Sequence, residues 1–303
     1  MSGSTLFTDA MRLTPAGDGR YDGELNEHWT IGPRGAGPKV HGGAMLALCA
    51  NAARLEHDVD ADWPIAISGN FLWAPDPGPM RVTTTVRKRG RRVSLIDVEL
   101  SQGGRTAVRA AVTMGEPEHH VAPLLSVNPV VPLMPPEPPP DLDPIGPGHP
   151  MADVVNLAHG CDIRPSLTTL QPRTDGGPAR TRGAQEAPRT RGAQEEPRTQ
   201  GAQEAPVIEY WVRPRGVAPD PLFALLCGDV SAPVTFAVNR FGWAPTVQLT
   251  AFLRTLPADG WLRIVCTTVQ IGQDWFDEDH IVVDCEGHIV VQSRQLAMVP
   301  PPQ

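Results

Sequence analysis

Hydrophobic and polar residues alternate along four short runs in the first third of the chain. Turn residues separate these runs, with Gly and Pro at 76–79, Gly at 90 and two Gly at 103–104. Alternation of period two between such turns is typical of antiparallel strands. The pattern predicts a first strand within residues 20–31 and four more at 65–73, 80–89, 93–101 and 106–114.

One stretch between these strands, residues 40–55, is apolar without alternation. It is rich in Ala and Leu, and the small side chains fit close packing against a sheet. We therefore expect a helix here. A unit of one strand, one helix and four strands is an α+β arrangement.

The same order of patterns recurs in the second half of the chain. A short helix is expected within residues 220–233, where Asp220 can cap the first turn and Pro221 fits inside it. Strands are expected on both sides of this helix. The repetition predicts an α+β double hotdog fold, with two tandem antiparallel sheets each wrapped on a long helix. The second set of strands is expected at 161–165, 207–213, 246–254, 261–270, 275–284 and 288–298.

Composition divides the 303 residues into two units and a connector. This length allows two domains with cores of their own. Residues 115–150 are rich in Pro, which cannot pair inside a sheet, so we expect an extended connector on the surface. The predicted boundaries are 1–118 for the N-terminal unit, 119–150 for the connector and 151–303 for the C-terminal unit.

A nonapeptide occurs in three near-identical copies, at 180–188, 189–197 and 198–206. The copies are rich in Arg, Glu, Gln, Gly and Pro and have no apolar face to bury. Such a composition predicts a disordered insertion in a loop, spanning about 171–206. A docking role for the insertion is the alternative.

Charge and cysteine usage exclude several functional classes. The net charge of −8 disfavours binding to nucleic acid or to an acidic membrane. The N-terminus lacks the charged start and apolar core of a signal peptide, and no apolar run is long enough to span a membrane. The five cysteines have no metal-binding spacing, so we expect reduced thiols, no metal and no cofactor in a cytoplasmic protein.

Asp229 stands out because it is a carboxylate inside the apolar run of the second predicted helix, on which we expect it to sit. A buried carboxylate is costly unless it is paired or hydrogen-bonded. One interpretation is an Asp at a helix end. The other is the working carboxylate of an acyl-thioester hydrolase, which acts as a general base towards water.

Several short motifs, taken in order, resemble one family. They occur at 42–43 (Gly-Gly), 210–215, 225–230, 242–250, 252–254 and 291–297. The chain resembles acyl-CoA thioesterases built as a tandem double hotdog, close to the bacterial acyl-CoA thioesterase II type and to actinobacterial thioesterase-family proteins. The resemblance implies hydrolysis of an acyl-CoA partner to fatty acid and CoA, and it leaves homo-oligomers open.

The resemblance implies three catalytic residues, Asp229, Gln295 and Thr246. The strand that follows Thr246 is one residue out of step with the family pattern, so Gln248 or Thr250 could take its place. These three side chains share one strand face if the alternation is regular. Gln248 also stands where the acyl-CoA thioesterase II type has an Asp.

Substrate binding is expected at the start of the first helix, at His41, Gly42 and Gly43, with Gln248 contributing from its strand. A helix N-terminus offers N–H groups to an oxyanion, and glycine lets a thioester carbonyl approach. His41 is either a base or part of the helix cap. Single-hotdog thioesterases have an acidic residue where this chain has Ala50, so one composite site is expected, with Asp229 facing the two glycines.

The basic turn at 87–92 offers Arg87, Arg89 and Arg91 as contacts for the phosphates of CoA. A solvated turn is the alternative. Two other functions also remain open. Because Gln248 departs from the family pattern, a non-catalytic protein that binds acyl thioesters is one alternative. A hotdog hydratase or dehydratase is disfavoured because the motif Gly-Asp-x-Asn-Pro-x-His is absent from the sequence.

Overall fold

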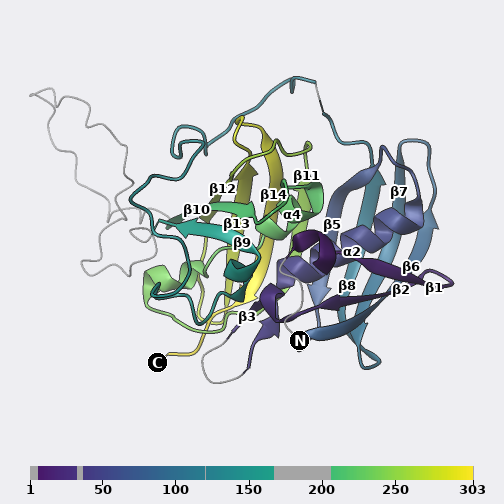
Figure 1. Ribbon diagram of the computed structural model, residues 1–303, viewed down its shortest axis with the longest axis horizontal. Coiled ribbons are helices and arrows are strands. Elements are labelled where there is room, and N and C mark those ends of the chain that lie inside the picture. The colour runs from purple at the N-terminus through teal and green to yellow at the C-terminus, as the bar shows by residue number, and fades with distance from the viewer. Residues whose placement is uncertain (1–5, 33–36, 120, 167–205, 303) are drawn as a thin grey trace, which may run out of the picture.

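Twelve strands form one continuous sheet in which every pairing is antiparallel. The computed structural model describes residues 6–32, 37–119, 121–166 and 206–302. The strand order is β1-β2-β6-β7-β8-β5-β11-β14-β13-β12-β10-β9. In Figure 1 the N-terminal strands lie on the right and the C-terminal strands on the left, with helices α2 and α4 near the centre.

The two halves of the sheet have the same topology. In the first half the sheet order is β2-β6-β7-β8-β5, and in the second it is β10-β12-β13-β14-β11. Each strand therefore has a counterpart, and the repeated pattern expected from the sequence is present. The first-half bounds are β1 (Leu13–Gly17), β2 (Arg20–Leu25), β5 (Trp63–Phe71), β6 (Gly78–Lys88), β7 (Val93–Gln102) and β8 (Arg105–Gly115). The second-half bounds are β9 (Cys161–Pro165), β10 (Val207–Pro214), β11 (Thr246–Leu253), β12 (Leu262–Thr267), β13 (Trp275–Val283) and β14 (Ile289–Met298).

The halves join where β5 pairs with β11, from Asn70 opposite Gln248 to Ala66 opposite Phe252. The expectation of two separate sheets was therefore wrong. Within each half, β5 or β11 would be an edge strand with unpaired N–H and C=O groups. Pairing the two edges satisfies those groups and closes the two halves into one sheet.

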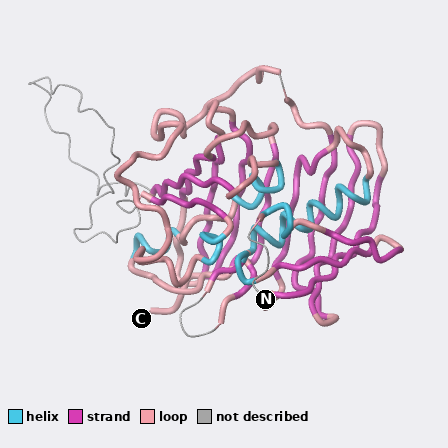
Figure 2. The backbone as a smooth tube through the Cα atoms, viewed as in Figure 1, coloured by secondary structure: helices cyan, strands magenta, loops and turns pink. Residues whose placement is uncertain are grey.

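Helix α2 (Gly42–His57) crosses the first half of the sheet, and most of its side chains are buried. Its Ala and Leu residues favour helix, and it ends where Asp58 adopts the left-handed conformation and its N–H donates to the carbonyl of Arg54. Figure 2 shows α2 as the longest helical segment of the tube.

Helix α4 (Pro221–Cys227) is much shorter than α2, so the expectation of a long helix on each half was wrong for the second half. Asp220 caps it as predicted, because its carboxylate accepts a hydrogen bond of 2.7 Å from the N–H of Phe223. The helix ends at Gly228, a residue with low helix propensity. The chain then turns within residues 228–234.

The Pro-rich connector packs against the second half of the sheet. Val130 and Met134 are buried beside Trp211 and Val265, and the indole N–H of Trp211 donates to the carbonyl of Pro135. A connector that runs only along the surface was therefore a wrong expectation for these residues. Their apolar side chains cover the face of the sheet that points away from the helices.

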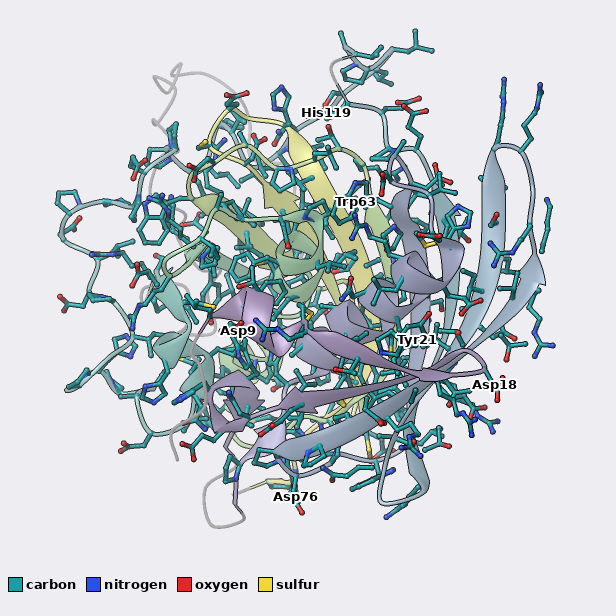
Figure 3. All side chains as sticks on the ribbon, turned by 45° about the vertical axis from the view of Figure 1, so that its right-hand side comes forward. Asp9, Asp18, Tyr21, Trp63, Asp76 and His119 are labelled. Carbon is teal, nitrogen blue, oxygen red and sulfur yellow. The ribbon has the colours of Figure 1, made fainter. Side chains whose placement is uncertain are left out.

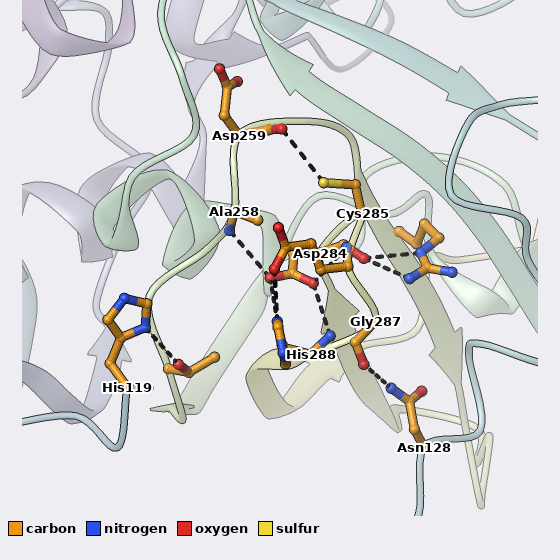
Figure 4. Close-up of polar contacts among 11 residues, drawn as sticks. His119, Asn128, Ala258, Asp259, Asp284, Cys285, Gly287 and His288 are labelled. Atoms are coloured by element: carbon orange, nitrogen blue, oxygen red, sulfur yellow. Dashed lines mark hydrogen bonds and ion pairs between the residues drawn. The ribbon is translucent and has the colours of Figure 1, made fainter. Parts of the chain in front are cut away.

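A second attachment of the connector lies near the β13–β14 turn (Figure 4). Asn128 donates 2.9 Å to the carbonyl of Gly287, and His119 contacts the hydroxyl of Thr255. The buried Asp284 organises this turn by accepting from the backbone N–H of His288. These contacts fix the path of the chain between the two halves.

Smaller elements complete the described fold. The predicted first strand is shorter than expected, because Asn26 accepts from the N–H of His28 and starts a 3-10 turn. The three nonapeptide copies lie outside the described residues, except for Pro206. No helix of the described chain is both long and apolar enough to cross a membrane. The remaining elements are α1 (Phe7–Ala10), η1 (Glu27–Trp29), β3 (Thr30–Ile31), β4 (Lys39–Val40), η2 (Asn156–His159) and η3 (Val234–Val238).

Candidate active site

A cavity of about 580 Å³ is lined by residues of both halves of the sheet and of the segment before β9. Its apolar walls include Met45 and Phe71 from the first half and Phe276 from the second. The side chains that supply polar groups to its lining include His41, Asp229, Thr246, Glu278 and Gln295. A mostly apolar pocket of this size with a few converging polar groups is typical of a small-molecule site.

Asp229 lies in the turn after α4, two residues beyond the end of the helix at Cys227. The expectation that it sits on the helix itself was wrong. The turn brings its carboxylate to the first turn of α2, where a Cβ on Gly42 would lie 2.6 Å from the Oδ2 of Asp229. The structure therefore brings Asp229 and the Gly-Gly pair together across the two halves.

The two glycines are required by this close approach. A Cβ on Gly43 would lie 2.6 Å from the carbonyl oxygen of Leu226 and 3.1 Å from the Cβ of Asp229. The N–H of Gly43 also donates to the carboxylate of Asp229. From the sequence we expected the space beside the two glycines to accommodate a thioester carbonyl. In the structure, Asp229 itself occupies part of that space.

The protonation of Asp229 is set by two opposing effects. Burial raises its pKa to about 7, and the hydrogen bond from the N–H of Gly43 opposes that rise. The carboxyl is thus poised to exchange a proton near neutral pH, as a general base requires.

His41 is buried at the start of α2, and its ring forms a hydrogen bond with the backbone of Asp229. Burial lowers the pKa of His41 to about 4, against this hydrogen bond. An imidazole with so low a pKa is a weak proton acceptor at neutral pH. The geometry favours His41 as an anchor for the turn that carries Asp229.

Thr246 and Gln295 meet across β11 and β14, where the hydroxyl of Thr246 donates 2.8 Å to the Oε1 of Gln295. Regular alternation would turn Thr246 to the face of Gln248. Instead, a β-bulge at Val247 shifts the register, so that Thr246 pairs with Ala297 and Gln248 with Leu296. The extra residue of the bulge turns Thr246 towards the helices.

Gln248 and Thr250 lie away from the cavity, on the opposite face of β11. Gln248 donates to the hydroxyls of Thr250 and Ser68, and these two hydroxyls bond to each other at 2.9 Å. The expectation that Gln248 binds substrate, or that Gln248 or Thr250 replaces Thr246, is corrected by this register. The three side chains stabilise the junction between β5 and β11 instead.

Glu278 is a site residue that the sequence reasoning missed. It lies on β13 opposite Gln295, is almost completely buried, and accepts a hydrogen bond from the Nε2 of Gln295. Burial raises the pKa of Glu278 to about 8. Its signal in the sequence is a carboxylate at an inward position of β13, two residues after the buried Phe276.

Two sequence models match most of the chain. The acyl-CoA thioesterase N-terminal domain matches residues 30–115, and the acyl-CoA thioesterase C-terminal domain matches residues 164–299. This chain belongs to the acyl-CoA thioesterase family. It is a thioester hydrolase.

The chain is also similar to a relative and to solved structures over nearly its whole length. An uncharacterised protein of Mycobacterium tuberculosis is 58% identical over 320 residues, which cover 98% of this thioesterase and 99% of the relative. A thioesterase II candidate from Thermobifida fusca has a TM-score of 0.75 at 26% identity, covering 97% of both chains. A hot dog protein of unknown function from Alicyclobacillus acidocaldarius has a TM-score of 0.69 at 18% identity, covering 98% of both chains, and supports the fold alone.

One group in the described part of this thioesterase has the composition of a metal site. Ligand atoms of Cys266, Glu278 and His280 lie within 4.8 Å of one another and are buried. However, Glu278 already accepts from Gln295 and from the N–H of Val234, and the Nε2 of His280 is hydrogen-bonded to the hydroxyl of Ser231. These atoms serve a hydrogen-bond network beside the cavity.

The basic turn lies at the far end of α2 from the cavity. Arg89 donates to the carbonyls of Glu56 and His57 in the last turn of the helix, and Arg87 pairs with Asp97. A helix of 16 residues is about 24 Å long, so the Arg89 contact lies about that far from Gly42.

Figure 3 labels Tyr21, which marks this end of α2 because its hydroxyl donates to Glu56. Arg89 is therefore held away from the cavity, and Arg87 and Arg91, which belong to the same turn, are not among the residues that line it. In the structure, Arg89 acts as a cap for α2, which favours cations at its C-terminus.

Proposed function

We propose that this thioesterase hydrolyses an acyl-CoA thioester to a free fatty acid and CoA, with Asp229 activating the water. One observation carries the proposal. Asp229, Thr246 and Gln295 come from three separate elements and line one apolar cavity beside the N-terminus of α2. Such convergence of a titratable carboxyl and two hydrogen-bonding side chains is typical of an active site.

In the proposed reaction, the carboxylate of Asp229 takes a proton from water while the water oxygen attacks the thioester carbonyl carbon. The carbon–sulfur bond then breaks, and the leaving thiolate of CoA takes the proton from Asp229. Thr246 and Gln295 orient the water, because an amide and a hydroxyl both donate and accept hydrogen bonds. The raised pKa of Asp229, about 7, suits both transfers near neutral pH.

The thioester carbonyl is proposed to lie at the first turn of α2, where Gly42 lines the cavity. Helix N-terminal N–H groups and the helix dipole stabilise a developing oxyanion. The acyl chain would then extend along the apolar wall that includes Met45, Phe71 and Phe276. His41 holds the turn of Asp229 in place through its hydrogen bond with the backbone.

Release of free thiol from a panel of short to long acyl-CoAs tests the proposal, with Asp229→Asn beside the wild type. We expect the wild type to hydrolyse at least one chain length, and kcat to fall about 100-fold or more in Asp229→Asn, because the amide cannot take a proton. Acyl-CoA binding without thiol release would instead indicate a binding protein. Full turnover by Asp229→Asn would exclude this residue as the base.

A further inference from the structure

Side chains of three strands hold the turn that carries Asp229. We call residues 228–234 the Asp229 turn. Its backbone and Ser231 hydroxyl make hydrogen bonds with Ser293 of β14, with His280 and Glu278 of β13, and with Tyr210 of β10. The turn is therefore positioned by the sheet, and not by the short helix before it alone.

Glu278 differs from the other anchors because it has a second partner. Its Oε1 accepts 2.6 Å from the N–H of Val234, and its Oε2 accepts from the Nε2 of Gln295. Gln295 in turn accepts from Thr246 through its Oε1. A single carboxyl thus joins the Asp229 turn to the pair of side chains proposed to orient the water.

The direction of these bonds decides how the amide of Gln295 is turned. A primary amide has an acceptor end and a donor end of almost equal size, so packing alone does not distinguish the two orientations. Here the hydroxyl of Thr246 faces the oxygen of Gln295, and the acceptor oxygen of Glu278 faces the nitrogen. One N–H of the amide bonds to Glu278, and the other can donate to a water or to a carboxylate.

A carboxyl in this position is costly to the fold. The side chain of Glu278 is 1% exposed, and within the described residues its hydrogen-bond partners are N–H groups and not a cationic side chain. Burying such a group opposes folding unless its bonds compensate. A buried polar group that opposes folding is typical of a functional site, where local rules of stability are broken for the sake of function.

We propose that Glu278 is a positioning residue that fixes the amide orientation of Gln295 and ties it to the turn that carries Asp229. Glu278 acts through Gln295 and does not itself exchange a proton with the substrate. This inference rests on the proposed function, because it assigns a role relative to that reaction.

A double-mutant cycle tests the inference in the full chain, using an acyl-CoA that the wild type hydrolyses. The variants are Glu278→Gln, Gln295→Ala and the two combined. We expect Glu278→Gln to lower kcat by about 10- to 100-fold, with KM changed by less than about threefold, because the water is misplaced while the acyl cavity is intact. In the Gln295→Ala background, Glu278→Gln should lower kcat by less than about threefold, since its route of action is already gone.

Asp279→Asn is the matched control, because it removes the next carboxylate of β13, which pairs with the exposed Arg294 at 3.6 Å on the other face. We expect its kcat to equal that of the wild type. A folded Glu278→Gln with wild-type kcat would overturn the inference, and so would an equal loss in both backgrounds. If Glu278→Gln does not fold, Glu278→Asp keeps the carboxyl group but shortens its reach, and wild-type kcat in that variant would overturn the inference as well.

The two proposals fail separately. Hydrolysis by the wild type and its loss in Asp229→Asn support the proposed function whatever Glu278→Gln shows. Additive effects of Glu278→Gln and Gln295→Ala in an active enzyme overturn the role of Glu278 alone.

Discussion

Asp229 is the residue whose behaviour the fold changes most. In the sequence it is an acidic residue at a helix end, and in the structure it is a buried carboxyl with a pKa of about 7. The shift comes first from burial, and the hydrogen bond from Gly43 limits it. Because Gly43 has no Cβ, the Asp229 turn can come close enough to accept this bond from the backbone N–H.

The raised pKa predicts a pH dependence of the wild type. The base must be ionised, so kcat/KM should be constant above about pH 7 to 8 and fall about tenfold for each pH unit well below pH 7. Rates of thiol release between pH 5 and 9 measure this. If kcat/KM stayed constant down to pH 5, the base would have a pKa closer to that of an ordinary aspartate, which would contradict a buried base.

Gln295 was identified from the sequence and Glu278 was not, for a physical reason. The motif around Gln295 is a local feature of one strand. The importance of Glu278 comes from its cross-strand pairing with Gln295 and from a bond to Val234, which is more than forty residues away in the chain. Only the folded sheet brings these groups into contact.

Strand β11 shows how a single bulge can make a prediction from regular alternation wrong. Alternation places Thr246, Gln248 and Thr250 on one face, but the bulge at Val247 sends Thr246 to the cavity and leaves the other two outside. A one-residue slip moves a side chain to the opposite face of a sheet.

The bulge predicts a difference between two like substitutions. Thr246→Val should lower kcat about tenfold or more, because it removes the hydroxyl that holds Gln295. Thr250→Val removes a hydroxyl of the same strand on the other face, and kcat should stay within about twofold. Thiol-release kinetics of both variants check this, and equal losses would argue against the bulged register.

The first turn of α2 provides another test at the level of an element. Helix propensity alone predicts that Gly43→Ala stabilises the protein. The structure predicts the reverse, because the new Cβ would lie 2.6 Å from the carbonyl oxygen of Leu226. We expect a loss of about 1–3 kcal/mol in the free energy of unfolding, together with a lower kcat as the Asp229 turn moves.

Gly146→Ala is the control for this substitution, because its Cβ would meet no atom within 4 Å. Denaturant unfolding of both variants gives the comparison. Stabilisation by Gly43→Ala would show that α2 and the Asp229 turn are not in close contact in solution.

At the scale of the whole molecule, the site depends on the way the two halves join. Each half supplies only part of the proposed site. The first half contributes the two glycines and His41, and the second half contributes Asp229, Thr246 and Gln295. The pairing of β5 with β11 and the contact of α2 with the Asp229 turn hold these two parts together. The cavity is a property of the duplicated sheet and not of either half.

The nonapeptide repeats predict tolerance to deletion. They connect β9 to β10, which are antiparallel neighbours, with Pro165 opposite Tyr210. A hairpin connection needs only a short loop, and each doubling of loop length costs about 0.6 kcal/mol. Removing residues 180–197 should therefore leave kcat unchanged and the melting temperature within about 2 °C. A large loss of activity or stability would assign the repeats a role in the site or in docking.

Local patterns in the sequence determined most of the strands, though not β1 or β4, together with helix α2, the cap of α4, the duplication and the candidates Asp229, Gly42 and Gly43. These features depend on alternation, turn residues and helix or strand propensity among residues close in the sequence, so they can be predicted without knowledge of the fold. The Arg turn, by contrast, was assigned from charge alone, and the fold places it at the opposite end of α2.

Tertiary structure alone decided four things: the union of two expected sheets into one, the bulged register of β11, the turn that carries Asp229 away from α4, and the link from Glu278 to Gln295. Each depends on backbone or side-chain pairing between segments that are distant in the sequence. Such pairings are selected by the satisfaction of edge hydrogen bonds and by the burial of polar groups, which no local window of residues can show.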